Sequence, residues 1–334
     1  MPPRREVFWV TKVLVTGGLG FIGAEVSKQL LDAGAEVVIL DSFASYFPLF
    51  HEDAGLYQRF VHDRVAPLNG RVQLERGDTR HKDELRRVML KHRPDRVIHL
   101  AALPLANVST TYSEEAIGSI VAATTNLLEV VRDLDHFERF VYASSSMVYG
   151  EFVEHPATES HPTHPKNIYG GAKLCGEVVT RTYGEALGIE YAIVRPSAVY
   201  GPTDVNRRVV QIFVENALRG RPLVLKGGAS NALDFTYVKD IASGFVKAAL
   251  VPAAANETFN ITRGEGRTLG ELVGILREII GDIEVEEAEL DHIIPRRGAL
   301  DTSRARQILG FESAYALEDG VREYVEFVRS YLET

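Results

Sequence analysis

The strongest constraint on the fold of this chain is a regular alternation of short Val/Ile-rich runs with longer amphipathic stretches. Segments with the spacing of amphipathic helices separate apolar runs at residues 12–17, 35–41, 71–78, 96–102, 139–145 and 190–197. Strands that are apolar throughout are buried on both faces, and the intervening helices supply the crossovers that parallel strands need. The pattern predicts an α/β fold built on a doubly wound parallel sheet.

The alternation changes after Pro196. Helix-like segments then dominate, at 207–220, 235–250, 268–281 and 317–332, with short strand-like runs at 222–225 and 257–262. We therefore expect two domains. The sheet domain comprises residues 1–196 plus about 224–262, and a smaller mixed α/β domain comprises about 197–223 plus 263–334. Ligands of such a sheet bind in the cleft at the carboxyl ends of its strands.

Composition excludes several classes of protein. The formal net charge of −9 over 334 residues argues against nucleic-acid and membrane partners, because both prefer a basic surface. No apolar stretch approaches the roughly 18 residues of a membrane span. The N-terminal apolar run is cut by Thr11 and Lys12, so we expect no signal peptide. The single cysteine, Cys175, excludes an intrachain disulfide and fits a reducing, cytoplasmic location.

A glycine-rich turn joins the first predicted strand to the first predicted helix. "TGGLGFIG" places Gly17, Gly20 and Gly23 at the spacing that lets a chain turn tightly, approach a pyrophosphate and pack helix against strand. Phe21 and Ile22, between the last two glycines, begin the helix. This context predicts a dinucleotide site, so the sheet domain is expected to be a Rossmann domain.

Two carboxylates follow the glycine turn at later strand ends. Asp41 ends the second strand, where a carboxylate accepts hydrogen bonds from an adenosine ribose and repels a 2′-phosphate. That favours NAD over NADP. Asp78 ends the third strand, where it could contact the adenine edge or simply start a turn.

Three serines in "SSSMVYG" (144–150) follow the fifth strand, and "YGGAK" places Tyr169 and Lys173 four residues apart on one helix face. A tyrosine has an ordinary pKa near 10 and is a poor base at neutral pH. A Lys ammonium at about 4 Å could lower that pKa by a few units. Tyr169 could then take a proton from a sugar hydroxyl, with Ser146 orienting the same oxygen and Lys173 holding the nicotinamide ribose.

With these motifs the chain resembles the extended short-chain dehydrogenase/reductase superfamily, in its nucleotide-sugar epimerase/dehydratase branch. The resemblance rests on "TGGLGFIG", Asp41, "RGD", "HLAA", "SSSMVYG", "YGGAK" and "RPSAVYGP", and extends to "RRGALDTSRARQILGF". It implies catalytic Ser146, Tyr169 and Lys173 and a tightly held NAD. It also implies a homodimer that pairs through the helix after "HLAA" and the helix that carries Tyr169. It also implies that the cofactor contacts the strand ends at Asp78, Thr79, Leu100, Ala101 and Ala102.

The branch of the family is indicated by two residues after the catalytic serine. Dehydratases of this family carry an Asp-Glu pair there and decarboxylases a Glu, whereas this chain has Met147 and Val148, which cannot move a proton. The resemblance therefore implies an epimerase acting at C4 of a UDP-hexose or UDP-hexuronate. Epimerisation at another carbon, and dehydratase, decarboxylase or reductase activity on similar sugars, remain open. So does a non-catalytic dinucleotide sensor on the same fold.

The substrate diphosphate must be held in an unusual way, because Leu233, Ile120 and Ala198 replace polar residues that are common in the family. Guanidinium groups suit phosphates and sugar carboxylates. The candidate substrate ligands are Ser145, Ser146, Arg207, Arg208, Arg296 and Arg297, with Arg208 favoured because "RRVV" resembles a nucleotide-contacting segment of uronate-modifying members.

Two segments carry no predicted site. The histidines and glutamates of residues 154–164 lie among prolines without helical spacing, so we expect a solvated loop and no metal. Residues 51–64 are polar overall, and we expect a surface element.

Overall fold

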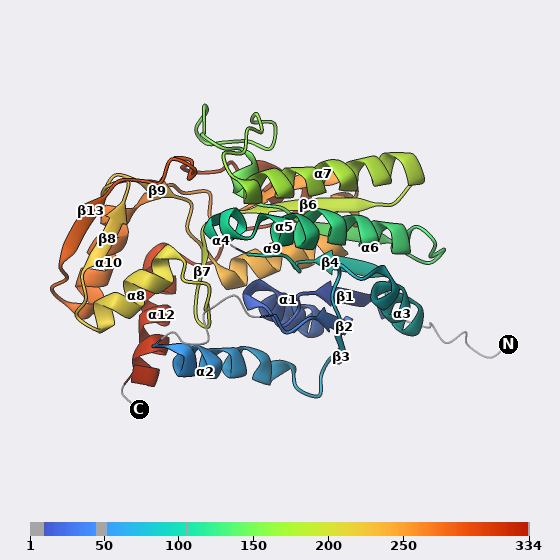
Figure 1. Ribbon diagram of the computed structural model, residues 1–334, viewed down its shortest axis with the longest axis horizontal. Coiled ribbons are helices and arrows are strands. Elements are labelled where there is room, and N and C mark those ends of the chain that lie inside the picture. Colours follow the sequence, from blue (N-terminus) through green and yellow to red (C-terminus); the bar gives the residue numbers. More distant parts are fainter. Residues whose placement is uncertain (1–9, 45–51, 105, 333–334) are drawn as a thin grey trace.

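The computed structural model describes residues 10–44, 52–104 and 106–332. Its centre is a seven-stranded parallel sheet in the order β11-β6-β5-β4-β1-β2-β3 (Figure 1). The strands are β1 (Lys12–Thr16), β2 (Glu36–Asp41), β3 (Gln73–Arg76), β4 (Arg96–His99), β5 (Arg139–Ala143), β6 (Tyr191–Pro196) and β11 (Glu257–Ile261). The predicted doubly wound fold is confirmed. The strand order reverses between β1 and β4, the usual ligand-binding position of such sheets.

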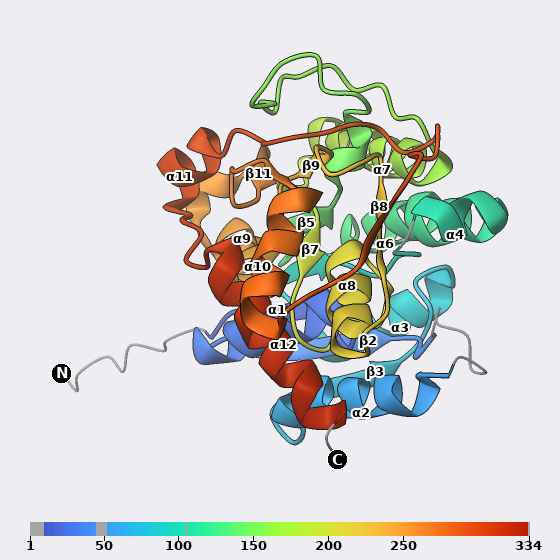
Figure 2. The ribbon, with the colours of Figure 1, turned by 90° about the vertical axis from the view of Figure 1, so that its left-hand side faces the viewer.

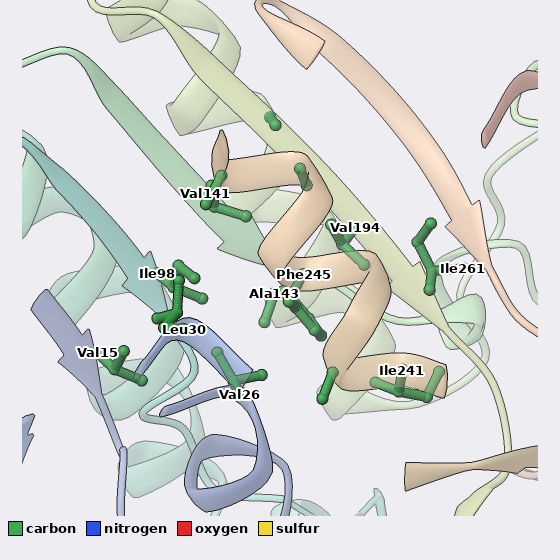
Figure 3. Close-up of a cluster of buried hydrophobic side chains, with 14 of the residues drawn as sticks. Val15, Val26, Leu30, Ile98, Val141, Ala143, Val194, Ile241, Phe245 and Ile261 are labelled. Carbon is green, nitrogen blue, oxygen red and sulfur yellow. The ribbon is translucent and has the colours of Figure 1, made fainter. Parts of the chain in front are cut away.

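Helices cover both faces of this sheet. One face carries α1 (Phe21–Asp32), α9 (Val238–Leu250) and α11 (Ser303–Leu309), and the other carries α3 (Lys82–His92), α6 (Ala123–Val131) and α7 (Ile168–Leu187). Successive strand residues alternate between the two cores, Val13 and Val15 facing the first and Leu14 the second, as a period of two requires. Figure 3 shows Ile98 and Val141 on the face that α9 covers with Phe245. Both faces of the sheet are thus apolar and buried.

A second core lies beside the sheet. Three helices enclose it, α8 (Val209–Leu218), α10 (Leu269–Ile280) and α12 (Leu317–Leu332). Small sheets border it: β8 (Leu223–Lys226) with β13 (Val285–Ala288), β9 (Ala232–Leu233) with β12 (Arg267–Thr268), and β7 (Val199–Tyr200) with β10 (Thr236–Tyr237). Residues 224–226, which we placed in the sheet domain, therefore pair within this second region, whereas α9 and β11 return to the main sheet. The division into two domains stays a prediction.

The helix α2 (Ala54–Val65) joins the two regions. We predicted a surface element here, and most of the helix is exposed or half-buried, but Leu56, Tyr57 and Phe60 are buried in the second core with α8 and α12. Figures 1 and 2 both show α2 beside α12. The chain that leaves β2 therefore crosses to the second core before it returns to β3.

Shorter helical segments also belong to the described fold. The helices α4 (Ala106–Thr111) and α5 (Ser113–Ile117) precede α6. A short helical turn at Ser146–Val148 follows β5. No helix in the described ranges is long and apolar enough to cross a membrane.

Candidate active site

A cavity of about 510 Å³ opens at the carboxyl ends of β1, β2, β4 and β5. Its volume is in the range of small-molecule and cofactor sites. Its lining includes every residue predicted to contact the cofactor: Gly17, Gly20, Phe21, Ile22, Gly23, Asp41, Asp78, Thr79, Leu100, Ala101, Ala102, Tyr169 and Lys173. The structure brings these predicted residues together, and their roles as NAD ligands stay predictions.

The glycine turn has the backbone that the motif requires. Gly17 has φ +67, and a Cβ at Gly23 would lie 2.1 Å from the carbonyl oxygen of Gly17. A side chain at either position would therefore prevent the turn from packing under α1. Within the described chain, no side chain caps α1 at Gly20. The first amides of α1 are thus available to bind an anion at the positive end of the helix dipole.

Asp41 is held against this turn. Its Oδ2 accepts a hydrogen bond from the amide of Leu19 at 3.0 Å, and its Oδ1 accepts one from the amide of Phe43 at 2.8 Å. A carboxylate has about four acceptor positions, so two remain for ribose hydroxyls. The glycine cradle, the uncapped helix and the fixed carboxylate fit a dinucleotide whose adenosine ribose carries no phosphate.

Asp78 has a stronger protein partner than the sequence suggested. Its carboxylate pairs with the guanidinium of Arg80 at 2.6 Å, and the hydrogen bonds from Arg80 lower the pKa of Asp78. The amide of Asp78 donates to Glu84 at 2.8 Å. The Asp78 carboxylate thus lies in the cavity wall already paired, so a contact with the adenine edge stays a prediction.

The three serines have three different partners. The hydroxyl of Ser144 donates to Glu177 at 2.5 Å. The Oγ of Ser145 accepts from the amide of Met147 at 3.2 Å, which caps the turn that follows, and its side chain also hydrogen-bonds with Tyr169. The Oγ of Ser146 accepts from Arg297 at 2.8 Å. Ser144 also lines the cavity, whereas Ser145 contacts Tyr169 and Ser146 contacts Arg297.

Tyr169 and Lys173 lie in the first turns of α7, which begins after Asn167 accepts a capping hydrogen bond from Gly170 at 2.9 Å. Burial raises the pKa of Tyr169, while the charge of Arg208, the hydrogen bond with Ser145 and the charge of Arg297 oppose the rise. We expected Lys173 to be the cation that lowers this pKa. Its ammonium instead lies 5.8 Å from the Tyr169 ring centroid and donates to the Ala143 carbonyl at 2.7 Å.

Lys173 is buried, and this burial lowers its pKa to about 7, although the charge of Glu177 one turn later opposes the change. His99, also buried, shares a hydrogen bond with Thr16 at 2.7 Å. Burial and the charge of Lys173 lower the pKa of His99 to about 3. His99 is therefore neutral near pH 7.

The four candidate arginines separate into two groups. Arg208 lines the cavity, pairs with both oxygens of Asp204 at 2.9 Å and lies 5.8 Å from the Phe21 ring centroid. Arg297 contacts Ser146, as described above.

The other two arginines point elsewhere. Arg207 donates to the Tyr57 hydroxyl at 3.1 Å, toward the second core. The amide of Arg296 donates to Glu151 at 2.8 Å, and Arg296 lines a separate hollow with Lys166. The structure thus brings Arg208 and Arg297 toward Tyr169 and does not bring Arg207 or Arg296 there.

Sequence reasoning missed the ion pair that supports these groups. Glu177 is fully buried on α7 and accepts from Arg195 Nε at 2.8 Å and from Arg195 Nη2 at 2.6 Å. Arg181 donates to the same carboxylate at 2.8 Å. The signal was present, because Arg195 is a charged residue inside an otherwise apolar strand and needs a buried partner.

The loop at residues 151–166 is less solvated than we expected. His161 is buried, where its Nε2 accepts from the Val153 amide at 2.9 Å and its Nδ1 donates to the Pro162 carbonyl at 2.8 Å. Both ring nitrogens are therefore used within the loop. Among the described residues, no group of three or more His, Cys, Asp or Glu could hold a metal ion.

Comparison with known proteins agrees with this geometry. The family model of the NAD dependent epimerase/dehydratase family matches residues 13–262. A putative UDP-glucose 4-epimerase from Methanocaldococcus jannaschii is 31% identical over 95% of this chain and 98% of its own length.

Two solved structures are also similar. A UDP-glucose 4-epimerase from Thermotoga maritima, solved with UDP-glucose, has a TM-score of 0.86 at 30% identity and covers 96% of this chain and 100% of its own. A UDP-glucuronic acid 4-epimerase from Bacillus cereus, solved with UDP-glucuronic acid and NAD, has a TM-score of 0.87 at 26% identity with the same coverages. Decarboxylases and dehydratases of nucleotide sugars also occur among the matches. This chain is a member of the NAD-dependent epimerase/dehydratase family.

Proposed function

We propose that this protein is an NAD-dependent nucleotide-sugar epimerase that inverts C4 of a UDP-hexose or UDP-hexuronate through a 4-keto intermediate. One observation carries the proposal: Tyr169 and Lys173 line the cavity, and Arg297, whose charge acts on Tyr169, donates to Ser146, with no proton-transferring side chain at 147 or 148. NAD, when bound, supplies a reversible acceptor for the hydride of the sugar carbon. The remaining steps belong to the protein.

Tyr169 is the proposed acid–base group. Its phenolate oxygen takes the proton of the C4 hydroxyl during oxidation, and the resulting phenol returns that proton after the ketone has turned its other face to the cofactor. Arg208 and Arg297 assist because their charges favour the phenolate. Ser146 polarises the same substrate oxygen, and Lys173, beside the Ala143 carbonyl, is placed to hold the nicotinamide ribose.

The proposed substrate ligands are the two arginines that face this end of the site. Arg297 offers a guanidinium beside Ser146, and Arg208 offers one at the cavity wall. Both can bind phosphate or carboxylate oxygens in pairs. The UDP-glucose and UDP-glucuronic acid in the related structures support a UDP-sugar. Ser145 is the proposed additional substrate contact.

The alternative reactions need a group that this site lacks. Dehydration or decarboxylation requires an acid or base beside Ser146. Met147 is buried there, and Val148 packs with Tyr149 and Phe152 in a small apolar cluster. A non-catalytic sensor would have no use for Tyr169 beside two guanidinium charges. These observations favour the epimerase.

We also propose a cytoplasmic homodimer. The single cysteine supports the location. Tyr112, Ile117 and Val178 are exposed on the α5 and α7 side of the sheet, which is the side through which the resemblance predicts pairing. Exposed apolar groups of this kind mark candidate interfaces.

The test is incubation with UDP-, dTDP-, GDP- and CDP-sugars in heavy water, followed by proton NMR of the products. A new diastereomer without deuterium would support hydride shuttling at a hydroxyl-bearing carbon and identify the sugar. Deuterium next to a carbonyl would indicate enolisation, and a dehydratase, a decarboxylase or an epimerase acting beside a carbonyl would replace the proposal.

A further inference from the structure

An unpaired cation lines the cofactor cavity from outside the predicted motifs. Arg64, in the last turn of α2, is a lining residue, and its Nε is buried without a hydrogen-bond partner in the described part of the chain. The carboxylates of Asp41 and Asp204 attract this guanidinium, and Arg208 repels it. Burial lowers the pKa of Arg64. The guanidinium therefore lies near two carboxylates, yet its Nε donates no hydrogen bond to any described residue.

These two acids already have partners. Asp41 accepts from the amides of Leu19 and Phe43, as described above. Asp204 accepts from Arg208 through both oxygens, and Asn206 donates to it at 3.0 Å. A buried charge without a close partner is costly. A phosphate in this cavity would give the Nε of Arg64 an acceptor that it lacks among the described residues.

The packing of α2 fixes the position of Arg64. Tyr57 and Phe60 anchor the helix in the second core, and the Tyr57 hydroxyl donates to Glu215 at 2.8 Å. Tyr57 and Phe60 precede Arg64 by seven and four positions, so the three side chains lie on the same side of α2. The guanidinium is therefore presented to the cavity by a packed helix, which suits a binding residue.

We propose that Arg64 binds a phosphoryl oxygen of the dinucleotide pyrophosphate, an inference that rests on the proposed placement of NAD in this cavity. The uncapped start of α1 and the glycine turn line the same cavity and also favour a phosphate. The diphosphate of a nucleotide sugar has the same chemistry. Arg208, a proposed substrate ligand, also lines this cavity, but the position of Arg64 near Asp41, whose carboxylate is held against the glycine turn, favours the dinucleotide.

The experiment compares R64Q with R59Q. Arg59 lies on the same helix, is exposed and donates to the Tyr331 carbonyl, so it controls for the loss of one positive charge from α2. The amount of NAD retained on the purified protein after dialysis, and the Kd values of NAD and UDP by calorimetry, are measured for both variants. Loss of one charge-assisted hydrogen bond predicts NAD binding roughly tenfold to a hundredfold weaker in R64Q. R59Q should match the wild type, and UDP affinity should be unchanged in both.

Three results would overturn the inference. The first is NAD affinity in R64Q within about twofold of wild type, a factor too small for a charged hydrogen bond. The second is weakened UDP binding with normal NAD binding, which would assign Arg64 to the substrate. The third is a nucleotide-free R64Q protein that melts below the wild type, since removal of an unpaired charge should not destabilise it. Turnover is not measured, so a protein without epimerase activity could still confirm the role of Arg64.

Discussion

Replacing Glu177 by Gln tests whether the buried ion pair supports the catalytic helix. The carboxylate is fully buried and accepts two hydrogen bonds from Arg195, one from Arg181 and one from Ser144. Burial raises the pKa of Glu177, but the hydrogen bonds and charge of Arg195 outweigh that effect, so the pKa lies below its usual value. The folded protein therefore stabilises the ionised form.

The side-chain amide of a glutamine at position 177 can accept only half of these hydrogen bonds. Its oxygen can accept from Arg195 Nε and from Ser144, but its NH₂ group then faces the Nη2 donors of Arg195 and Arg181. Arg195, whose side chain is 4% exposed, is left with an uncompensated charge. Breaking a buried pair by removing one partner costs about 3–5 kcal/mol, a large part of the roughly 5–15 kcal/mol that stabilises a typical fold.

The assay is urea denaturation followed by circular dichroism, with E185Q as the control. Glu185 is an exposed acid on the same helix, and its loss should change the free energy of unfolding by about 0.5 kcal/mol or less. If E177Q and E185Q unfold within about 1 kcal/mol of each other, a cost of the size expected for a buried pair is absent and the reasoning fails. The pH dependence gives a second check. A carboxyl with a lowered folded pKa contributes stability that is lost as pH falls through that value, so the difference between wild type and E177Q should shrink as the pH falls below the ordinary Glu pKa of about 4.3.

Three further predictions concern the cavity and the reacting groups. G23A should lose bound NAD, because its Cβ would lie 2.1 Å from the Gly17 oxygen, whereas G274A, with nothing within 4 Å of its Cβ, should keep it. The NAD released on denaturation is measured for both variants. Retained NAD in G23A would contradict the proposal that the glycine turn binds the cofactor. Burial lowers the pKa of Lys173 from 10.5 to about 7, so between these pH values the unfolded chain binds more protons than the folded protein. The stability of wild type relative to K173M should therefore rise with pH across this range. Parallel curves of melting temperature against pH for the two proteins would refute this. R297M should raise the KM for the nucleotide sugar about tenfold or more and move the rate profile to higher pH without changing NAD retention; an unchanged KM would remove Arg297 from the substrate site.

The central sheet was predictable because its strands are apolar on both faces, and the glycine turn was predictable because backbone geometry limits what can occupy Gly17 and Gly23. The buried face of α2 was not predicted, since the average polarity of the segment hides a narrow apolar stripe. Leu56, Tyr57, Phe60 and Val61 have helical spacing, and giving more weight to that spacing than to composition would have indicated a buried face.

The electrostatics of the site could not be predicted in the same way. The spacing of Tyr169 and Lys173 correctly placed them on one helix, but the charges that act on Tyr169 come from Arg208 and Arg297, on segments far from α7 in sequence. Which of four candidate arginines approach the tyrosine depends on how the second region packs beside the sheet. Local sequence patterns do not contain that information.

Inversion at C4 by removal and return of one hydride is tested with a UDP-sugar carrying deuterium at C4. The proposed reaction removes this label from one face of the sugar and returns it to the other, so the product should be the C4 epimer with its deuterium retained at C4. The Y169F protein should hold NAD and form almost none of this product. Loss of the label to solvent would contradict hydride return to C4. Turnover by Y169F equal to that of the wild type would contradict the role of Tyr169.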